Sequence, residues 1–295
     1  MSQLLNLDFH RLLKSLLFRI SVVLSVVYAV ILNITRYLKL RAVPDISSAF
    51  LDNNNSSADS FTFSGAMILI FISAVIISSF IGSEYSEGTI RNSFIAGHSR
   101  KEVYLSNFIV CASASVMILL SYILASIISG AILLEGPQLE INRLIISILS
   151  QCLSMVTFSA LLVFIAMLIH SRSAGTAALL LSTGIMLCFA MSSTTTLNEP
   201  QYYTDHSAVY TEEGSGEEKY GTFQQQNPRY ISGFPRAALE QLNNAMPVNG
   251  LYRVYLNSSQ SEPENFGLMA LYSVFASVLF NCAGIALFRK KISGR

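Results

Sequence analysis

The sequence predicts an all-α membrane protein with six transmembrane helices and with both termini in the cytoplasm. Of its 295 residues, 52% are hydrophobic and only 13% are charged, whereas a soluble domain carries roughly a quarter charged residues. The mean hydropathy of the chain is +0.50. The chain therefore lacks the polar surface that a water-soluble protein needs.

Six apolar runs are each long enough to cross a bilayer as a helix, since a helix rises ~1.5 Å per residue and the hydrocarbon core is ~30 Å thick. The runs are continuously apolar instead of alternating, which argues against a membrane β-barrel. We place the spans at 16–34, 63–82, 105–134, 144–169, 174–191 and 266–288. The expected domains are a membrane domain (1–191) with a cytoplasmic loop at 83–104, an extracellular segment (192–265), and a last helix with a basic cytoplasmic tail (266–295).

The distribution of charge predicts the orientation. With the N-terminus inside, the inner segments hold eleven of the 19 Lys and Arg residues but only four of the 18 Asp and Glu residues. Positive charge flanking the helices favours the cytoplasmic side. Arg36, Lys39 and Arg41 argue mildly the other way, but the basic C-terminal stretch FRKKISGR outweighs them. We expect a multi-pass protein of the plasma membrane.

No pattern of a catalytic or metal-binding site occurs in the sequence. His10, His98 and His170 fall at the predicted cytoplasmic edge and His206 falls outside, none with a nucleophile or carboxylate at a recognisable spacing. All four cysteines fall inside predicted spans without a CxxC pair, so we expect free thiols and no metal. A GxxxxGK[ST] loop for nucleotide is also missing, so we expect no enzyme and no cofactor in this chain.

Predicted spans two to six contain no Asp, Glu, Lys, Arg or His. Ion-coupled transporters commonly place such groups in the membrane, despite a cost of roughly 2.5–3.5 kcal/mol or more. Their absence weakens the hypothesis of a secondary transporter, although sodium coupling through hydroxyl and carbonyl oxygens stays open. If the protein transports a substrate, the energy must come from another chain.

A polar stretch between spans two and three, EYSEGTIRNSFIAGHSRKEVYLSN, is the most informative part of the sequence. Its middle can form a short amphipathic helix, with Ile90, Phe94 and Ile95 as the expected anchor. Gly97 is placed to end that helix, and Ser99 with Glu102 has the spacing of a capping box. The stretch thus predicts a helix, a surface elbow and a second helix; an ordinary solvated loop is the alternative.

The same stretch resembles the second cytoplasmic loop of ABC-2 type permeases, in which E-Y-x-x-G-T-[IL]-R-N-x-x-x-x-G-x-[ST]-R-x-x-x-[YF] recurs. Tyr104 occupies the last position of this pattern. The resemblance implies that the loop is a coupling helix, which docks into a cleft on an ATPase. The positions that it assigns to ATPase coupling are Glu84, Tyr85, Gly88, Thr89, Ile90, Arg91, Asn92, Phe94, Gly97, Ser99 and Arg100.

The resemblance also implies an assembly. A dimer of permeases, made of two copies or of a copy and a paralogue, works with two separate ABC ATPase subunits that hold ATP and Mg. Similar permeases serve lantibiotic immunity, bacitracin resistance, sodium extrusion and export of amphipathic peptide toxins. We expect no nucleic-acid partner.

An amphipathic N-terminal segment, NLDFHRLLKSLLF, precedes the first span. Its apolar residues can line one face, while His10, Arg11 and Lys14 are expected to meet headgroups and cytoplasm. In the resembling family this segment would be an elbow helix along the inner leaflet. A simple extension of the first span is the alternative.

Polar residues recur on single faces of the late spans. Gln151 shares a face with two serines in span four, and Ser273, Ser277 and Asn281 recur every fourth residue in span six. These four residues are candidates for a substrate path. Helix packing is the alternative, because membrane helices associate through small and hydrogen-bonding residues.

The extracellular segment is acidic and rich in tyrosine. Its stretch TEEGSGEEKYG predicts a flexible loop, and FPRAALEQLNNAMP predicts a helix opened by Pro235 and closed near Pro247. It could cover the outer mouth or bind a cationic peptide, or it could be a solvated cap without specificity.

These observations together predict the permease subunit of an ATP-driven exporter. The uncharged, Phe-rich spans suit a hydrophobic or amphipathic cargo better than an ion, and the resemblance implies that this cargo is an amphipathic or antimicrobial-type peptide. A lipid or a small hydrophobic drug is the alternative cargo. A membrane sensor or assembly subunit that transports nothing is the alternative of another class.

Overall fold

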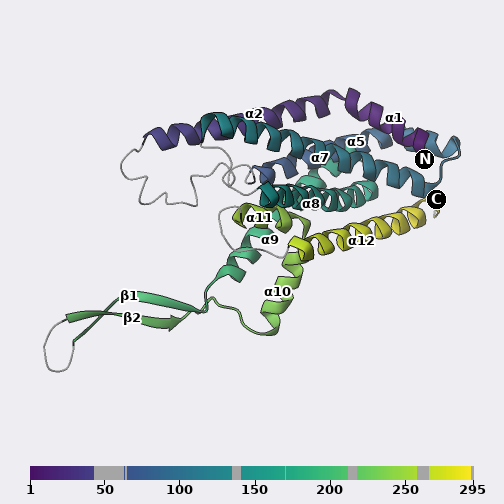
Figure 1. Cartoon of the computed structure of the whole chain (residues 1–295). Helices are drawn as coiled ribbons and strands as arrows, with labels where there is room; N and C mark the ends of the chain where they lie inside the picture. The colour runs from purple at the N-terminus through teal and green to yellow at the C-terminus, as the bar shows by residue number, and fades with distance from the viewer. Residues whose placement is uncertain are drawn as a thin grey trace.

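The computed structural model describes residues 1–42, 63, 65–134, 141–169, 171–211, 218–257 and 266–293. Within these residues, six helices are long and apolar enough to cross a bilayer, which confirms the predicted number of spans. They are α2 (Leu16–Ala42), α5 (Ala66–Ser86), α7 (Arg100–Leu133), α8 (Ile141–Leu168), α9 (Arg172–Asn198) and α12 (Phe266–Ser293). Both chain ends lie at one end of this bundle (Figure 1), which we name the inner end after the predicted orientation, and that orientation itself stays a prediction. The opposite end is the outer end.

Helix α5 is the most enclosed of the six and packs against α7, α8 and α9. Its middle is apolar on all sides, because residues such as Leu69, Ile70, Ile77 and Ile81 are all buried. A helix that is apolar all round belongs in the interior of a bundle. Helix α2 packs along α7, and α12 packs along α8.

Hydrogen bonds from polar side chains to backbone carbonyls of neighbouring helices connect α2 to α7 and α8 to α12. Asn33 of α2 donates from Nδ2 to the carbonyl of Ser126 in α7 at 2.9 Å. Thr157 of α8 donates from Oγ1 to the carbonyl of Ser273 in α12 at 2.9 Å. Lipid provides no hydrophobic drive between helices, so such contacts help to hold them together.

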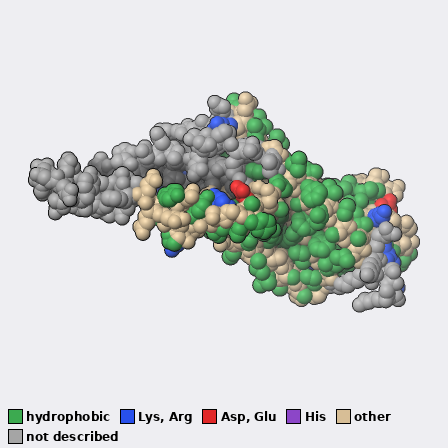
Figure 2. Space-filling view, turned by 90° about the horizontal axis from the view of Figure 1, so that it is seen from below, with side chains coloured by type: hydrophobic (Ala, Val, Ile, Leu, Met, Phe, Trp, Pro, Cys, Tyr) green, Lys and Arg blue, Asp and Glu red, His purple; other side chains and the backbone are tan. Residues whose placement is uncertain are grey.

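On the face shown in Figure 2, apolar side chains cover a broad band, and the few charged side chains lie on either side of that band. Helices α2 and α12 contribute many exposed Leu, Ile, Val and Phe side chains. In water such a surface would drive aggregation. It suits a bilayer, and the protein is a multi-pass membrane protein.

A separate helix, α1 (Ser2–Lys14), precedes the first span and ends at Ser15, where the backbone is extended. It packs along the first turns of α7. Its buried residues are Leu4, Asp8 and Leu12, spaced every fourth residue. Whether α1 lies along the inner leaflet stays a prediction.

Two strands and two helices lie between α9 and α12. Strands β1 (Tyr202–Thr211) and β2 (Glu218–Gln226) pair antiparallel, with Tyr202 opposite Gln226 and Thr211 opposite Glu218. This hairpin extends away from the bundle (Figure 1). The expectation of a flexible loop at 211–221 was wrong for its described parts, which pair as strands; residues 212–217 lie outside the described residues.

Helix α10 (Phe234–Ala245) has a proline in its first turn and ends at Met246, which confirms the predicted helix. A further helix that we did not expect, α11 (Pro247–Asn257), follows at once. It packs on α8 and α9, and its Val248 and Leu251 are 1% exposed. The segment between α9 and α12 therefore contributes to the core of the bundle.

Candidate functional site

The turn between α5 and α7 is a short helix with a defined start and a defined end. Helix α6 (Thr89–Ile95) begins after Gly88, with φ of 70°, and ends before Gly97, with φ of 88°. The N–H groups of Gly97 and His98 donate to the carbonyls of Phe94 and Ser93 and close the helix. Residues with a Cβ are disfavoured at such φ values. The predicted short helix and its end at Gly97 are confirmed, and its place at the membrane surface stays a prediction.

Helix α7 begins with the predicted capping box. Ser99 Oγ accepts from the N–H of Glu102 at 3.3 Å, and the Glu102 carboxylate accepts from the N–H of Ser99 at 2.9 Å. Glu102 also lies 3.7 Å from the amino group of Met1 and 3.8 Å from the imidazole of His98. The N-terminus of the chain thus lies beside the end of α6.

One face of α6 holds it against the bundle. Ile90 is buried, and the ring of Phe94 lies with its centroid 6.5 Å from that of Phe288 in α12. Tyr104 contacts the same phenylalanine from α7, at 6.4 Å. We expected Ile95 to help in this anchoring, and that was wrong, because Ile95 is 75% exposed.

The opposite face of α6 is open. Arg91 and Asn92 are exposed together with Ile95, so the face combines a cation, an amide and an apolar side chain. Such a mixture is typical of protein interfaces. Thr89 is the first residue of α6, and Arg100, the first residue of α7, is half-buried.

Glu84, which opens the motif, lies inside the protein and not on this face. It is 3% exposed, and its Oε1 accepts a hydrogen bond from Nη2 of Arg11 at 2.8 Å. Its Oε2 accepts from Nδ2 of Asn107 at 2.6 Å. Beside this pair, Ser106 donates from Oγ to Oδ2 of Asp8 at 2.6 Å. We name Asp8, Arg11, Glu84, Ser106 and Asn107 the inner polar cluster.

The inner polar cluster joins three helices at the inner end. Asp8 and Arg11 come from α1, Glu84 from the last turn of α5, and the remaining two from α7. We expected Arg11 to face headgroups, and that was wrong, because its guanidinium pairs with Glu84 and lies 4.4 Å from the ring centroid of Phe80. An ion pair is favoured here because a buried carboxylate without a partner is costly.

Sequence reasoning placed only Glu84 of this cluster among the functional residues. The predicted second span ended at residue 82, so the carboxylate was assigned to the loop. One signal was present: an acid at position 8 and an amide at position 107 interrupt otherwise apolar faces. Buried polar groups of this kind need partners.

Asp8 is itself buried, which affects its protonation. Burial raises the pKa of the Asp8 carboxyl above its ordinary value. The hydrogen bond from Ser106 and the positive charges of Arg11 and His98 lower the pKa, but they offset only part of this effect. Asp8 therefore holds a proton to higher pH than a solvated aspartate does.

Tyr85, the second residue of the motif, also points into the bundle. Its hydroxyl donates to the carbonyl of Met167 in α8 at 2.9 Å. Gly82, one turn earlier, packs against Arg172 of α9, because a Cβ added there would lie 2.8 Å from Cγ of that arginine. The inner end of α5 is therefore fixed to α8 and α9 as well as to α1 and α7.

The four candidate residues of the substrate path make separate contacts. Gln151 is fully buried and donates from Nε2 to the carbonyl of Phe63 at 3.4 Å. In α12, Asn281 donates to the carbonyl of Ser277 at 2.8 Å, and the carbonyl of Ser273 accepts from α8. Among the described residues, no hydrogen bond joins Gln151 to the other three. Their role in a substrate path stays a prediction.

A family model for ABC-2 family transporter proteins matches residues 5–193. The chain belongs to this family. The match begins inside α1 and ends inside the fifth span, α9, and it includes the turn with α6 and the whole inner polar cluster. The hairpin, α10, α11 and α12 lie beyond it. No curated protein matches the chain.

Membership makes this protein the membrane permease of an ABC transporter. In this family the permease is the transmembrane component and works with an ABC ATPase subunit. Among the described residues, no group of three or more His, Cys, Asp or Glu side chains is placed to hold a metal ion.

Proposed function

We propose that this ABC-2 permease exports an amphipathic peptide and that its ATPase docks on the open face of α6. A homodimer, or a dimer with a paralogue, brings two such faces together for two ATPase subunits, which hold ATP and Mg. The single observation that supports the docking most strongly is the build of α6. The seven-residue helix lies between two glycines with positive φ, Gly88 and Gly97, with one face anchored and the other exposed.

The inner polar cluster supports a mechanism for coupling. α6 follows α5 directly and leads into α7 through the capping box, so a displacement of α6 acts on both spans. The ion pair of Glu84 with Arg11 passes that displacement to α1. ATP binding on the partner then moves three helices as one unit at the inner end and reorients the bundle.

The composition of the membrane core supports the choice of cargo. Between the inner polar cluster and the outer ends, the spans bury apolar side chains together with scattered hydroxyls and amides, such as Ser78, Gln151 and Thr157. If the helices separate during transport, the groups that become exposed suit a molecule with one apolar and one polar side. Hydrophobic drugs and lipids share part of this chemistry and are the alternative cargo.

A reconstitution experiment tests the proposal. The ATPase that co-purifies with the full chain is identified, and the complex is placed in liposomes. ATP hydrolysis is then measured with a cationic amphipathic peptide, with a hydrophobic drug, and with added lipid. Stimulation by the peptide supports the proposal. Stimulation by drug or lipid alone would reject the peptide, and a chain that retains no ATPase would favour the sensor hypothesis.

A further inference from the structure

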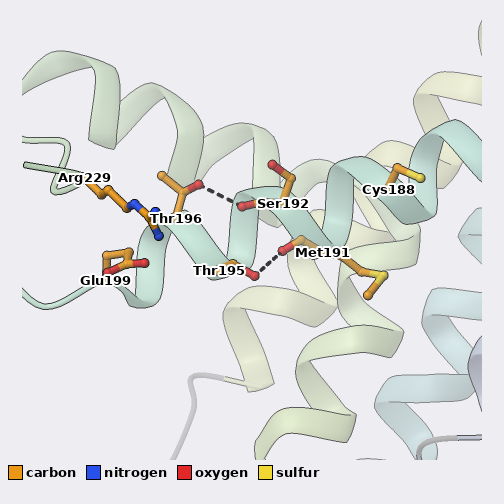
Figure 3. Close-up of a pocket in the computed structure, with 7 residues that line it drawn as sticks. All are labelled: Cys188, Met191, Ser192, Thr195, Thr196, Glu199 and Arg229. Carbon is orange, nitrogen blue, oxygen red and sulfur yellow. Dashed lines mark hydrogen bonds between the residues drawn. The ribbon is translucent and has the colours of Figure 1, made fainter.

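A cavity of about 720 Å³ opens at the outer end of α9, between that helix and the turn after β2. Cys188 and Met191 line it toward the membrane, Ser192 and Thr195 line its middle, and Glu199 and Arg229 lie beside one another at its far end (Figure 3). Its wall thus changes from apolar to hydroxylic to charged over three turns of helix.

The cavity continues the exposed face of α9. Leu181 and Ile185 are 68% and 61% exposed, and Cys188, Ser192 and Thr195 follow them at spacings of three and four residues. Residues at these spacings share one side of a helix. A molecule in contact with the exposed apolar part of α9 can therefore reach the cavity without leaving this face.

The length of α9 places the cavity at headgroup level. Its 27 residues span about 40 Å, roughly 10 Å more than a hydrocarbon core. The first residue is Arg172, and the stretch from 174 to 191 is apolar, so the excess falls on the final SSTTTLN. Glu199 and Arg229 then lie where phosphate and amine groups of the outer leaflet lie.

The two charges are close but leave room for a ligand. Glu199 receives hydrogen bonds from the hydroxyl of Tyr203 at 2.7 Å and from Nδ2 of Asn227 at 3.0 Å, and both reach the same oxygen, Oε2. The N–H of Arg229 donates to Oδ1 of Asn227 at 2.8 Å, which fixes the turn that carries the guanidinium. Within the described residues, the guanidinium and Oε1 form no ion pair with each other or with a third group.

The charges nevertheless influence one another. The hydrogen bonds from Tyr203 and Asn227 hold the pKa of Glu199 below its ordinary value, and the charge of Arg229 lowers it further. The carboxylate is therefore ionised at neutral pH, and the cavity presents one anion and one cation at its outer end.

We propose that this cavity binds a zwitterionic phospholipid of the outer leaflet, with its phosphate at Arg229, its ammonium group at Glu199, and an acyl chain along Met191, Cys188 and the exposed face of α9. A guanidinium suits a phosphate because it donates two parallel hydrogen bonds. An anionic headgroup can pair with Arg229 but is repelled by Glu199. A cationic peptide can pair with Glu199 but is repelled by Arg229. This lipid site is independent of which cargo the permease exports.

Native mass spectrometry of the full chain, titrated with dioleoyl phosphatidylethanolamine, tests this proposal. Glu199→Gln and Arg229→Gln are each expected to weaken lipid retention about three- to fivefold, as for a charge pair at a partly exposed site. Glu240→Gln on α10 and Arg143→Gln on α8 serve as matched controls, because both residues are exposed at the outer end and away from the cavity.

Phosphatidylglycerol separates a lost interaction from a damaged fold. Relative to wild type, retention of phosphatidylglycerol should fall in Arg229→Gln and stay equal or rise in Glu199→Gln. General misfolding would lower retention in both variants and would not produce this pattern. Equal retention of phosphatidylethanolamine by wild type, both variants and both controls would overturn the proposal. The proposal would also be overturned if a cationic amphipathic peptide displaced the lipid and this displacement were lost in Glu199→Gln but not in Arg229→Gln. That result would show that the cavity binds peptide.

Discussion

Arg11 and Glu84 are 73 positions apart in the sequence, yet their side chains form a hydrogen-bonded ion pair of 2.8 Å. Glu84 lies four residues before Gly88, the residue that precedes α6, and Arg11 lies on the helix that precedes the first span. The pair therefore fastens the N-terminal helix to the base of the turn that is proposed to meet the ATPase.

Replacing Arg11 by Gln should destabilise the protein, because it leaves a carboxylate with a side chain only 4% exposed without its cation. Breaking a buried pair costs ~3–5 kcal/mol, and the partial exposure of Arg11 reduces this to about 2 kcal/mol. The melting temperature in detergent should fall by about 5 °C. Lys14→Gln, an exposed residue on the same helix, should leave it unchanged.

A double variant tests whether the two residues act as a pair. Arg11→Met with Glu84→Gln removes both charges, so it should lose less stability than the two single variants added together. Additive losses would show that the ion pair does not contribute as a unit.

The pKa of Asp8 predicts a pH dependence. Since burial raises this pKa, the protonated form contributes stability below about pH 4, and that contribution is lost as the pH rises through the higher pKa of the folded state. Asp8→Asn keeps an acceptor for Ser106 and carries no charge. Its melting temperature relative to wild type should therefore rise with pH above about 4. A difference that falls or stays constant would contradict the shift.

A close approach between α7 and α12 predicts a steric effect. A Cβ added to Gly284 would overlap the ring and hydroxyl of Tyr104. Gly284→Ala should push the two helices apart and lower the melting temperature, and Tyr104→Leu in the same chain should restore part of the loss. Gly184→Ala is the control, because no neighbour lies within 4 Å of its added Cβ. Equal melting temperatures for Gly284→Ala and Gly184→Ala would contradict the packing.

The two parts of the segment between α9 and α12 should respond differently to change. Deleting residues 211–221 removes the far half of the hairpin, which extends away from the bundle, so membrane insertion and ATPase binding should persist. Gly250→Val should impair stability, because Gly250 of α11 packs directly on Ser154 of α8. If the deletion abolished assembly while the Gly250→Val protein stayed stable, the hairpin would be part of the structural core and α11 would not.

The number of spans and the corners of the α6 turn could be predicted from the sequence, because both rest on local rules. An apolar run of sufficient length forms a membrane helix, and Gly97 or Ser99 acts within a few residues of its own position. The ends of the helices were less predictable. Glu84 continues α5 beyond the apolar run, since hydropathy indicates where lipid contact ends and not where helical hydrogen bonding ends.

The inner polar cluster and α11 could not be predicted, because both depend on contacts between distant parts of the chain. From the sequence alone, an arginine on an amphipathic helix is expected to contact lipid headgroups. Only the tertiary structure shows that Glu84 lies beside Arg11 and pairs with it. Likewise, Pro247 indicates the end of one helix, and only the packing of Val248 against the bundle shows that another begins there.

The central claim is that the open face of α6 couples this permease to its ATPase. Arg91→Glu reverses the charge on that face, and Gly97→Val places a β-branched residue at a backbone φ of 88°, which strains the turn that follows α6. A surface charge contributes under ~1 kcal/mol to folding but more at a docked interface. Both variants should therefore reach the membrane at normal levels, and Arg143→Glu at the outer end serves as the control.

Cargo-stimulated ATP hydrolysis by the co-purified complex is the measurement that tests this claim most directly. Arg91→Glu should retain less ATPase or lose stimulation by cargo, Gly97→Val should retain ATPase but lose stimulation, and Arg143→Glu should match wild type. Normal ATPase retention and normal stimulation in both α6 variants would contradict the claim and leave α6 as a well-capped turn without a coupling role.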